Sequence, residues 1–377
     1  MERWQSAFEH TVEFNLSESG VQPLKLDELI CDSSQTSKLL NQELSYTQTN
    51  GTQELREVIA AQYPGTSPDN VLVTNGGAEA NFLAIWHLLD SSDEAIVMAP
   101  NYPQIYSLAH ASAGNVHKWW LRETHVGNKR RWRVDLDELH QLITPRTKMI
   151  AICNPNNPTG AIYPEATQRA MLELASSHGF VLLADEVYGD LGYDGPVPPM
   201  GLLDPEAPFI SFSSLSKAYL APGWRAGWMA VGANPRMDDV LAAIKKLADG
   251  RVCSNGPMQA AIRAALSSDR SHLQVFTKAL RERAELTSSS LNAIDGIKCV
   301  TPSAAFYAMP QVSLPAGKTD EDYVLGLLRS TGVLCVYGSG FGLPAEGGFF
   351  RVVFLAEPKE LTEIYELIST FTNQFLD

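Results

Sequence analysis

The chain has 377 residues, of which 45% are hydrophobic, so it can form a large buried core and two or three domains. Its formal net charge of -14 argues against a nucleic-acid partner, because phosphate binding needs clustered Lys and Arg. The nearest basic run, residues 129–131, is interpreted as a solvated turn before a strand.

The chain shows no run of about 18 uninterrupted apolar residues, so no membrane span is expected. The cysteines are odd in number and widely spaced, at Cys31, Cys153, Cys253, Cys299 and Cys335. This pattern favours free thiols in a reducing cytosol over disulfides or a zinc site. We therefore expect a cytoplasmic protein with no metal and no membrane partner.

The middle of the chain alternates short apolar runs with helical stretches. Strands are expected at residues 71–74, 94–98, 148–153, 180–184, 209–212 and 226–231. Helices are expected at residues 78–89 and 165–178. Buried strands that alternate with helices predict a mostly parallel sheet covered on both faces, which is an α/β fold.

The character of the sequence changes after about residue 272. A long helix is expected at residues 273–293, then strands, and a last helix at residues 359–376. We predict a large domain at residues 45–272 and a smaller α+β domain at residues 273–377. The N-terminal segment, residues 1–44, is expected to pack on the smaller domain.

Lys217 follows directly after one of the expected buried strands. Partial burial lowers the pKa of a lysine, which makes Lys217 a candidate amine nucleophile for a carbonyl. Ser214, Ser216 and Arg225 surround it in the sequence with two hydroxyls and a fork of donors, a set that suits a phosphate dianion. Taken alone, the motif is also compatible with an exposed loop lysine.

A glycine turn, Gly76 and Gly77, lies between an expected strand and an expected helix. Glycine lets the backbone approach an anion closely, and the start of a helix offers free N–H groups. An ordinary tight turn is the alternative.

Asp185 ends an expected buried strand, at the carboxyl edge where open α/β sheets place their ligands. A carboxylate there can pair with a protonated pyridine nitrogen and keep the ring cationic. The alternative is a structural or capping carboxylate.

Residues 154–160 contain two Asn-Pro steps directly after another expected strand. Such steps favour an extended, turning backbone, which would present the Asn157 amide over the edge of the sheet. A plain proline-rich loop is the alternative.

These four elements all follow expected strands, in the order glycine turn, Asn-Pro loop, Asp and Ser-x-Ser-Lys. In this combination the chain resembles the class I/II aminotransferases of pyridoxal 5′-phosphate (PLP) fold type I, from about Leu16 to the C-terminus. The resemblance implies a large PLP-binding domain, a smaller α+β domain and a transaminase of amino-acid metabolism or biosynthesis. Such an enzyme moves an amino group from an L-amino acid to a 2-oxo acid.

The resemblance also implies roles for individual residues. Lys217 would form the Schiff base with PLP and later move a proton, and Asp185 would pair with the pyridine nitrogen. Tyr188 and Asn157 would donate to the phenolic oxygen, and Tyr102 would stack on the ring. The implied phosphate cup consists of Gly77, Ala78, Ser214, Ser216 and Arg225.

Two further residues match family positions that bind substrate or a second subunit. Arg351, inside an apolar strand, would grip the substrate α-carboxylate together with Asn157. Tyr46 would reach the phosphate in the neighbouring subunit, which implies a homodimer with shared active sites. The alternatives are a structural ion pair for Arg351 and a core position for Tyr46.

The sequence departs from the family pattern in two segments. In residues 14–20 Glu18 lies between two serines, and we expect its carboxylate to face the substrate side chain and favour a cationic group. An exposed loop carboxylate or a helix cap is the alternative. In residues 303–307 Ala305 stands where the family usually has Gly, and the added methyl is expected to narrow the side-chain pocket.

Residues 17–20 are also similar to the same segment of capreomycidine synthase-like enzymes. Those enzymes use this fold to cyclise an arginine derivative. The alternative function is therefore a PLP-dependent cyclase, lyase or oxidase that acts on an arginine-type amino acid in specialised metabolism.

Overall fold

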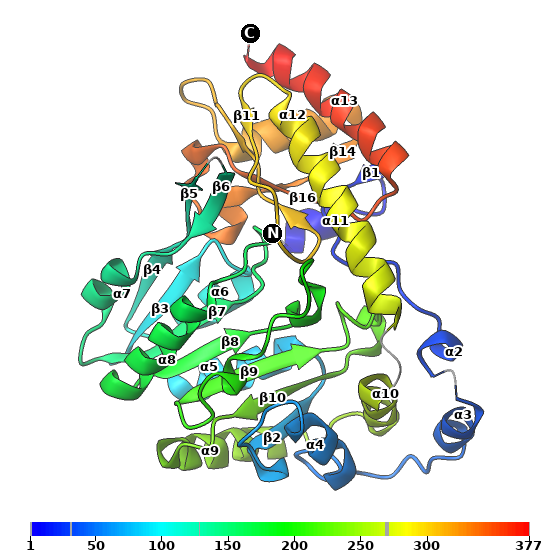
Figure 1. The fold of residues 1–377 in the computed structure, drawn as a ribbon, viewed down its shortest axis with the longest axis vertical. Coiled ribbons are helices and arrows are strands. Elements are labelled where there is room, and N and C mark those ends of the chain that lie inside the picture. Colours follow the sequence, from blue (N-terminus) through cyan, green and yellow to red (C-terminus); the bar gives the residue numbers. More distant parts are fainter. Residues whose placement is uncertain (1, 31, 128, 268–270, 377) are drawn as a thin grey trace.

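The computed structural model describes residues 2–30, 32–127, 129–267 and 271–376. The strands of its central sheet are Val71–Thr74 (β2), Glu94–Ala99 (β3), Asn115–Trp120 (β4), Thr147–Cys153 (β7), Val181–Asp185 (β8), Phe209–Ser214 (β9) and Gly227–Val231 (β10). Their order is β2-β10-β9-β8-β7-β3-β4 (Figure 1). Only β10 runs antiparallel to its neighbours, so the predicted mostly parallel sheet is confirmed.

Helices cover both faces of this sheet. One face packs on Gly77–Leu88 (α5), Pro103–Ser112 (α6) and Asp238–Asp249 (α9), and the other packs on Glu165–His178 (α8). Successive strand residues point to opposite faces, so Val97 joins the first layer while Ile96 joins the second. The near-continuous apolar runs in the sequence reflect this burial on both sides.

The remaining elements frame the sheet. The helices are Glu2–Phe8 (α1), Leu26–Leu29 (α2), Ser33–Leu40 (α3), Gln53–Ala60 (α4), Leu136–Leu142 (α7), Gly256–Ser267 (α10), Ser271–Asn292 (α11), Asp320–Thr331 (α12) and Pro358–Leu376 (α13). The short strands are Phe14–Asn15 (β1), Arg122–Val126 (β5), Lys129–Arg133 (β6), Ile297–Lys298 (β11), Tyr307–Ala308 (β12), Gln311–Val312 (β13), Val333–Leu334 (β14), Val336–Tyr337 (β15) and Phe350–Val353 (β16).

The C-terminal elements α11 to α13 gather at one end of the molecule, beyond the sheet (Figure 1). There β16 pairs with β12 and β15, and β1 from the N-terminus pairs in parallel with β14. Trp4 of α1 adds a hydrogen bond from its ring N–H to the Cys335 carbonyl, at 3.0 Å. The domain boundaries after residues 44 and 272 stay predictions.

The basic run of residues 129–131 is part of a strand, so its interpretation as a turn is wrong. Lys129–Arg133 forms β6, which pairs antiparallel with β5 and places Lys129 opposite Val126. Gly127, at φ +60°, lies in the connection between the two strands. Cross-strand pairing therefore outweighs the low strand propensity of this charged run.

Cys153, Cys253, Cys299 and Cys335 are free thiols, and Cys31 lies outside the described residues. Within the described ranges no helix is long and apolar enough to cross a membrane. The same ranges contain no group of three or more His, Cys, Asp or Glu side chains that could hold a metal ion.

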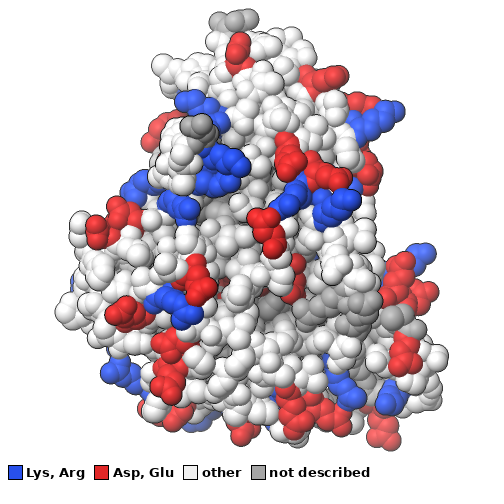
Figure 2. All heavy atoms as spheres, in the orientation of Figure 1, with Lys and Arg blue, Asp and Glu red and all other residues white. Residues whose placement is uncertain are grey.

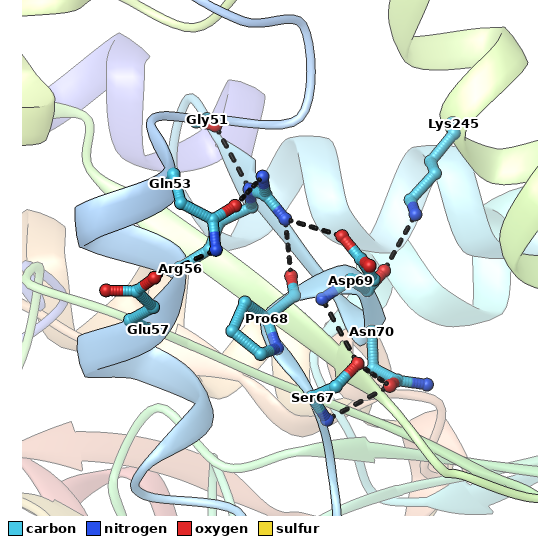
Figure 3. Close-up of polar contacts among 9 residues, drawn as sticks. All are labelled: Gly51, Gln53, Arg56, Glu57, Ser67, Pro68, Asp69, Asn70 and Lys245. Carbon is cyan, nitrogen blue, oxygen red and sulfur yellow. Dashed lines mark hydrogen bonds and ion pairs between the residues drawn. The ribbon is translucent and has the colours of Figure 1, made fainter.

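Arg56 of α4 ties this helix to the segment that precedes β2 (Figure 3). The side chain is 5% exposed and donates to the carbonyls of Gly51, at 3.1 Å, and Pro68, at 2.8 Å. It also donates to the side chains of Gln53, at 2.6 Å, and Asp69, at 3.1 Å. These bonds fix the start of the strand whose end carries the glycine turn.

Arg56→Ala should lower the free energy of unfolding by about 2–4 kcal/mol, because one buried and one partly buried carbonyl lose a charged donor. Urea unfolding followed by circular dichroism measures this loss. Asp69→Asn is the matched control and should cost less than about 1 kcal/mol, since its carboxylate is largely exposed. Equal losses in the two variants would contradict the assigned role of Arg56.

Candidate active site

Four strands of the sheet end at the same edge. Their last residues are Thr74, Cys153, Asp185 and Ser214, and a cavity of about 350 Å³ lies beside these strand ends. The predicted site residues that line it are Gly77, Ala78, Tyr102, Asn157, Asp185, Tyr188, Ser214, Ser216, Lys217, Arg225, Arg351 and Glu18. Residues far apart in the sequence thus meet in one cavity, as ligand sites of open α/β sheets do.

Lys217 points its amine into this cavity region and is held by the N-terminal segment. Its Nζ donates to the Ser19 carbonyl at 2.9 Å and approaches the Ser19 hydroxyl at 3.1 Å. Burial, with the nearby positive charge of Arg351, lowers the pKa of Lys217 to about 8. A larger share of the amine is therefore neutral near neutral pH than in an exposed lysine, which suits a nucleophile.

Asp185 ends β8 and is 5% exposed. Its Oδ1 accepts a hydrogen bond from the Val187 N–H at 3.2 Å. Burial raises the pKa of this carboxyl to about 7, although that hydrogen bond and Lys217 oppose the shift. A cationic partner placed in the cavity would favour the ionised carboxylate.

Tyr188, Asn157 and Tyr307 form a buried polar group on another wall. The hydroxyls of Tyr188 and Tyr307 lie 2.8 Å apart, and the Asn157 amide donates to the Tyr188 hydroxyl at 3.4 Å. Burial raises the pKa of Tyr188 well above its ordinary value, so the phenol keeps its proton. Tyr188 can therefore act as a hydrogen-bond donor to a ligand oxygen.

Arg351 of β16 is 1% exposed and lies between two aromatic rings, each centred 4.9 Å from its guanidinium carbon. It donates to the Asn157 side chain at 3.0 Å and to the Ser17 carbonyl at 2.6 Å. Among the described residues it makes no ion pair, and its Nε has no hydrogen-bond partner. The alternative that Arg351 belongs to a structural ion pair is therefore wrong. The charge of the Arg351 guanidinium is available to bind a carboxylate.

The glycine turn fits a phosphate. Gly76 adopts φ +88°, and a Cβ at this position would lie 2.4 Å from Nη2 of Arg225, so glycine lets the guanidinium approach the turn. No side chain caps the start of α5 at Gly77, which leaves N–H groups for a ligand. Ser214 and Ser216 are both buried beside this turn.

This set of donors fits PLP. The cavity offers an amine for an aldehyde, a carboxylate for a pyridine nitrogen, two neutral donors for a phenolic oxygen and a cup for a phosphate. The roles of the individual residues stay predictions, which the geometry makes possible.

Glu18 lines the cavity that contains Lys217, and its carboxylate makes no hydrogen bond or ion pair with the other described residues. It lies between β1 and α2, so the helix cap is wrong, whereas its exposed position in a loop agrees with the other alternative, an exposed loop carboxylate. Its backbone N–H donates to the Asn15 side chain at 3.1 Å, which fixes the local turn.

Two residues that were expected to belong to the site lie outside this cavity. Tyr46 is 83% exposed and does not line it, so the core position is wrong. Ala305 does not line it either, which contradicts the expected narrowing of the pocket. Instead Ala305 adopts φ +57°, a left-handed conformation that favours the Gly usual in the family.

Three further residues were not predicted from the sequence: Ser19 lines the cavity, and Ser17 and Tyr307 contact its lining residues Arg351 and Tyr188. Ser17 and Ser19 reach Arg351 and Lys217 across 334 and 198 positions of the chain, so no local pattern indicates these contacts. The only signal for Tyr307 was its place in the unusual segment of residues 303–307.

Comparison with known proteins places the chain in a family. The model of the family described as aminotransferase class I and II matches residues 25–368. An alanine aminotransferase from Mycobacterium bovis is 32% identical over 338 residues, which cover 86% of this chain and 77% of that protein. The glutamate-pyruvate aminotransferase AlaA from Haemophilus influenzae is 30% identical over 341 residues, covering 88% and 83%.

Solved structures agree with these matches. An alanine aminotransferase from Pyrococcus furiosus superposes with a TM-score of 0.87 at 32% identity, covering 97% of this chain and 93% of that one. A PLP-dependent aminotransferase from Streptococcus suis superposes with a TM-score of 0.85 at 27% identity, covering 99% and 97%. The predicted PLP fold type I is confirmed.

Borohydride treatment of the PLP-loaded protein should fix one PLP per chain on Lys217, because its pKa favours a reactive amine. Peptide mass spectrometry locates the adduct. Lys217→Ala should carry no fixed PLP, whereas Lys148→Ala, a control at an exposed lysine of β7, should label like the wild type. Label on another lysine of the wild type would refute the assignment.

Proposed function

Because this chain belongs to the class I and II aminotransferases and is a PLP-dependent transaminase, we propose that its amino donor is an L-amino acid with a cationic side chain. A 2-oxo acid receives the amino group. The observation that carries this proposal is Glu18, whose unpaired carboxylate lines the cavity beside Lys217. Glu18 is an exposed residue, but its carboxylate lines this cavity, where it would attract a guanidinium or ammonium group.

Each end of the substrate has a candidate partner in the chain. Arg351 binds the α-carboxylate, since its guanidinium is buried without an acidic partner among the described residues. Asn157 holds this guanidinium in place through its side-chain oxygen. Glu18 then meets the far end of the side chain, because both residues line one cavity.

The chain also supplies the groups that hold the cofactor and move the proton. Bound PLP supplies an electron sink for the negative charge that develops at the substrate Cα. Lys217 takes the Cα proton on its Nζ as general base, and a pKa of about 8 suits this task. Asp185 holds a positive charge on the ring nitrogen, while Tyr188 and Asn157 donate to the ring oxygen.

A second candidate donor is alanine, with pyruvate as its 2-oxo acid. It is favoured by the relatives described as alanine and glutamate-pyruvate aminotransferases. A third candidate is the cyclase, lyase or oxidase reaction on an arginine-type amino acid. Product analysis with labelled arginine separates these, because transfer yields a new amino acid from the 2-oxo acid acceptor, whereas the third reaction yields a cyclised product or ammonia and no new amino acid.

We further propose a homodimer in which Tyr46 reaches the phosphate site of the partner subunit. In support, Tyr46 is 83% exposed on the single chain, and Leu40 and Leu44 nearby are 79% and 87% exposed. Apolar side chains that are so exposed within one segment favour contact with a second protein surface, here the partner subunit. The cytoplasmic location stays a prediction.

Glu18→Gln should lower kcat/KM for arginine or lysine about 10- to 100-fold, because a charge-assisted hydrogen bond is lost. Its kcat/KM for alanine should stay within about threefold. Steady-state assays with a panel of amino donors measure both effects. Glu13→Gln, an exposed control in the same segment, should match the wild type. Equal wild-type activity on alanine, aspartate and arginine would refute the cationic donor.

Mixing Lys217→Ala chains with Tyr46→Ala chains should restore activity. If Tyr46 acts in the partner site, each mixed dimer has one intact site, so random mixing recovers about a quarter of wild-type turnover. Turnover is measured after co-expression and compared with each variant alone. No recovery in confirmed mixed dimers would place Tyr46 outside the partner site.

A further inference from the structure

A second cavity lies away from the active site, between the β5–β6 hairpin and helix α11. Its volume is about 610 Å³, against about 350 Å³ for the active-site cavity. No residue that lines it also lines the active-site cavity. Nothing in the transaminase reaction uses this second cavity.

The second cavity is locally cationic in a chain whose net charge is -14. Lys129, Arg130 and Arg131 line it from β6, and Arg281 lines it from α11. Figure 2 shows Lys and Arg side chains gathered over the hairpin. The acidic side chains among the lining residues are those of Asp194 and Glu285, so positive charge is in excess.

Two of these cations, Arg130 and Arg281, already have partners and form part of the cavity wall. Arg130 pairs with Glu123 at 3.0 Å and also donates to the Cys299 carbonyl at 3.4 Å. Arg281 forms an ion pair with Asp194. The Arg130–Cys299 contact joins the hairpin to the C-terminal part of the chain, and the Arg281–Asp194 pair joins α11 to the segment after β8.

The other two cations are left without acidic partners among the described residues. Arg131 is half-buried, and its guanidinium donates only to the Arg130 carbonyl, at 3.3 Å. Lys129 makes no hydrogen bond or ion pair with the rest of the described chain. A half-buried guanidinium without a counter-charge is unfavourable, and an anion in the cavity would offset that cost.

We propose that this second cavity binds a small multivalent anion, an organic phosphate or a polycarboxylate, through Arg131 and Lys129. Lys129 and Arg131 are two positions apart on one strand, and such a pair of cations suits a ligand with at least two negative charges. The volume admits a metabolite rather than a single inorganic ion. Binding weakens as salt concentration rises, because at least one of the cations is exposed to solvent.

Isothermal titration calorimetry on the PLP-loaded protein tests this site, because the cofactor then fills the phosphate cup of the active site. Pyrophosphate and citrate are the two probes, at low ionic strength. We expect one of them to bind at one per chain, which identifies the ligand class. The Lys129→Gln/Arg131→Gln double variant should bind it at least about tenfold more weakly.

Arg122→Gln is the matched control, since Arg122 lies on β5 of the same hairpin but does not line the second cavity. It should bind the probe like the wild type. Thermal unfolding of all variants confirms that they are folded. Failure of both probes to bind, unchanged binding by the double variant or an equal loss in Arg122→Gln would overturn the proposal.

Discussion

The active site depends on the burial of Asp185 and Lys217, whose desolvation outweighs the attraction between their opposite charges. Burial raises the pKa of Asp185 to about 7 and lowers that of Lys217 to about 8, so both groups move toward neutral pH. A free carboxylate and a free ammonium are each unfavourable here. In the proposed site, Lys217 would hold the aldehyde carbon of PLP and Asp185 would face its ring nitrogen, so bound PLP would offer each buried group a partner.

The sheet is what lets such distant residues share a cavity. Parallel strands end at one edge, so the loops after β2, β7, β8 and β9 carry their polar side chains to the same place. Helices on both faces bury every residue of β2, β3, β8 and β10, so polar side chains from these strands gather at the strand ends. Arg56 contributes at a distance, because it fixes the start of β2 and so the position of the glycine turn.

The sequence was sufficient for features set by local patterns and insufficient for those set by long-range contacts. Lys217 and Asp185 follow apolar runs that end at predictable strand ends, so their place at the sheet edge could be predicted. Strand β4 was missed because edge strands mix polar and apolar residues. The basic run of β6 was misread as a turn, since only its pairing with β5 makes it a strand. Ser19 touches Lys217 across 198 positions, and no periodicity reports such a contact.

The N-terminal segment contacts both Lys217 and Arg351. Pairing of β1 with β14 brings the residues after it over the cavity, where the Ser17 carbonyl meets Arg351 and Ser19 meets Lys217. Glu18 lies between these two contacts, so a side chain that pairs with its carboxylate also stabilises the segment in this position. In the proposed reaction, a cationic donor would therefore also help to hold this segment over the cavity. A donor without that charge gains only the interaction of its α-carboxylate with Arg351.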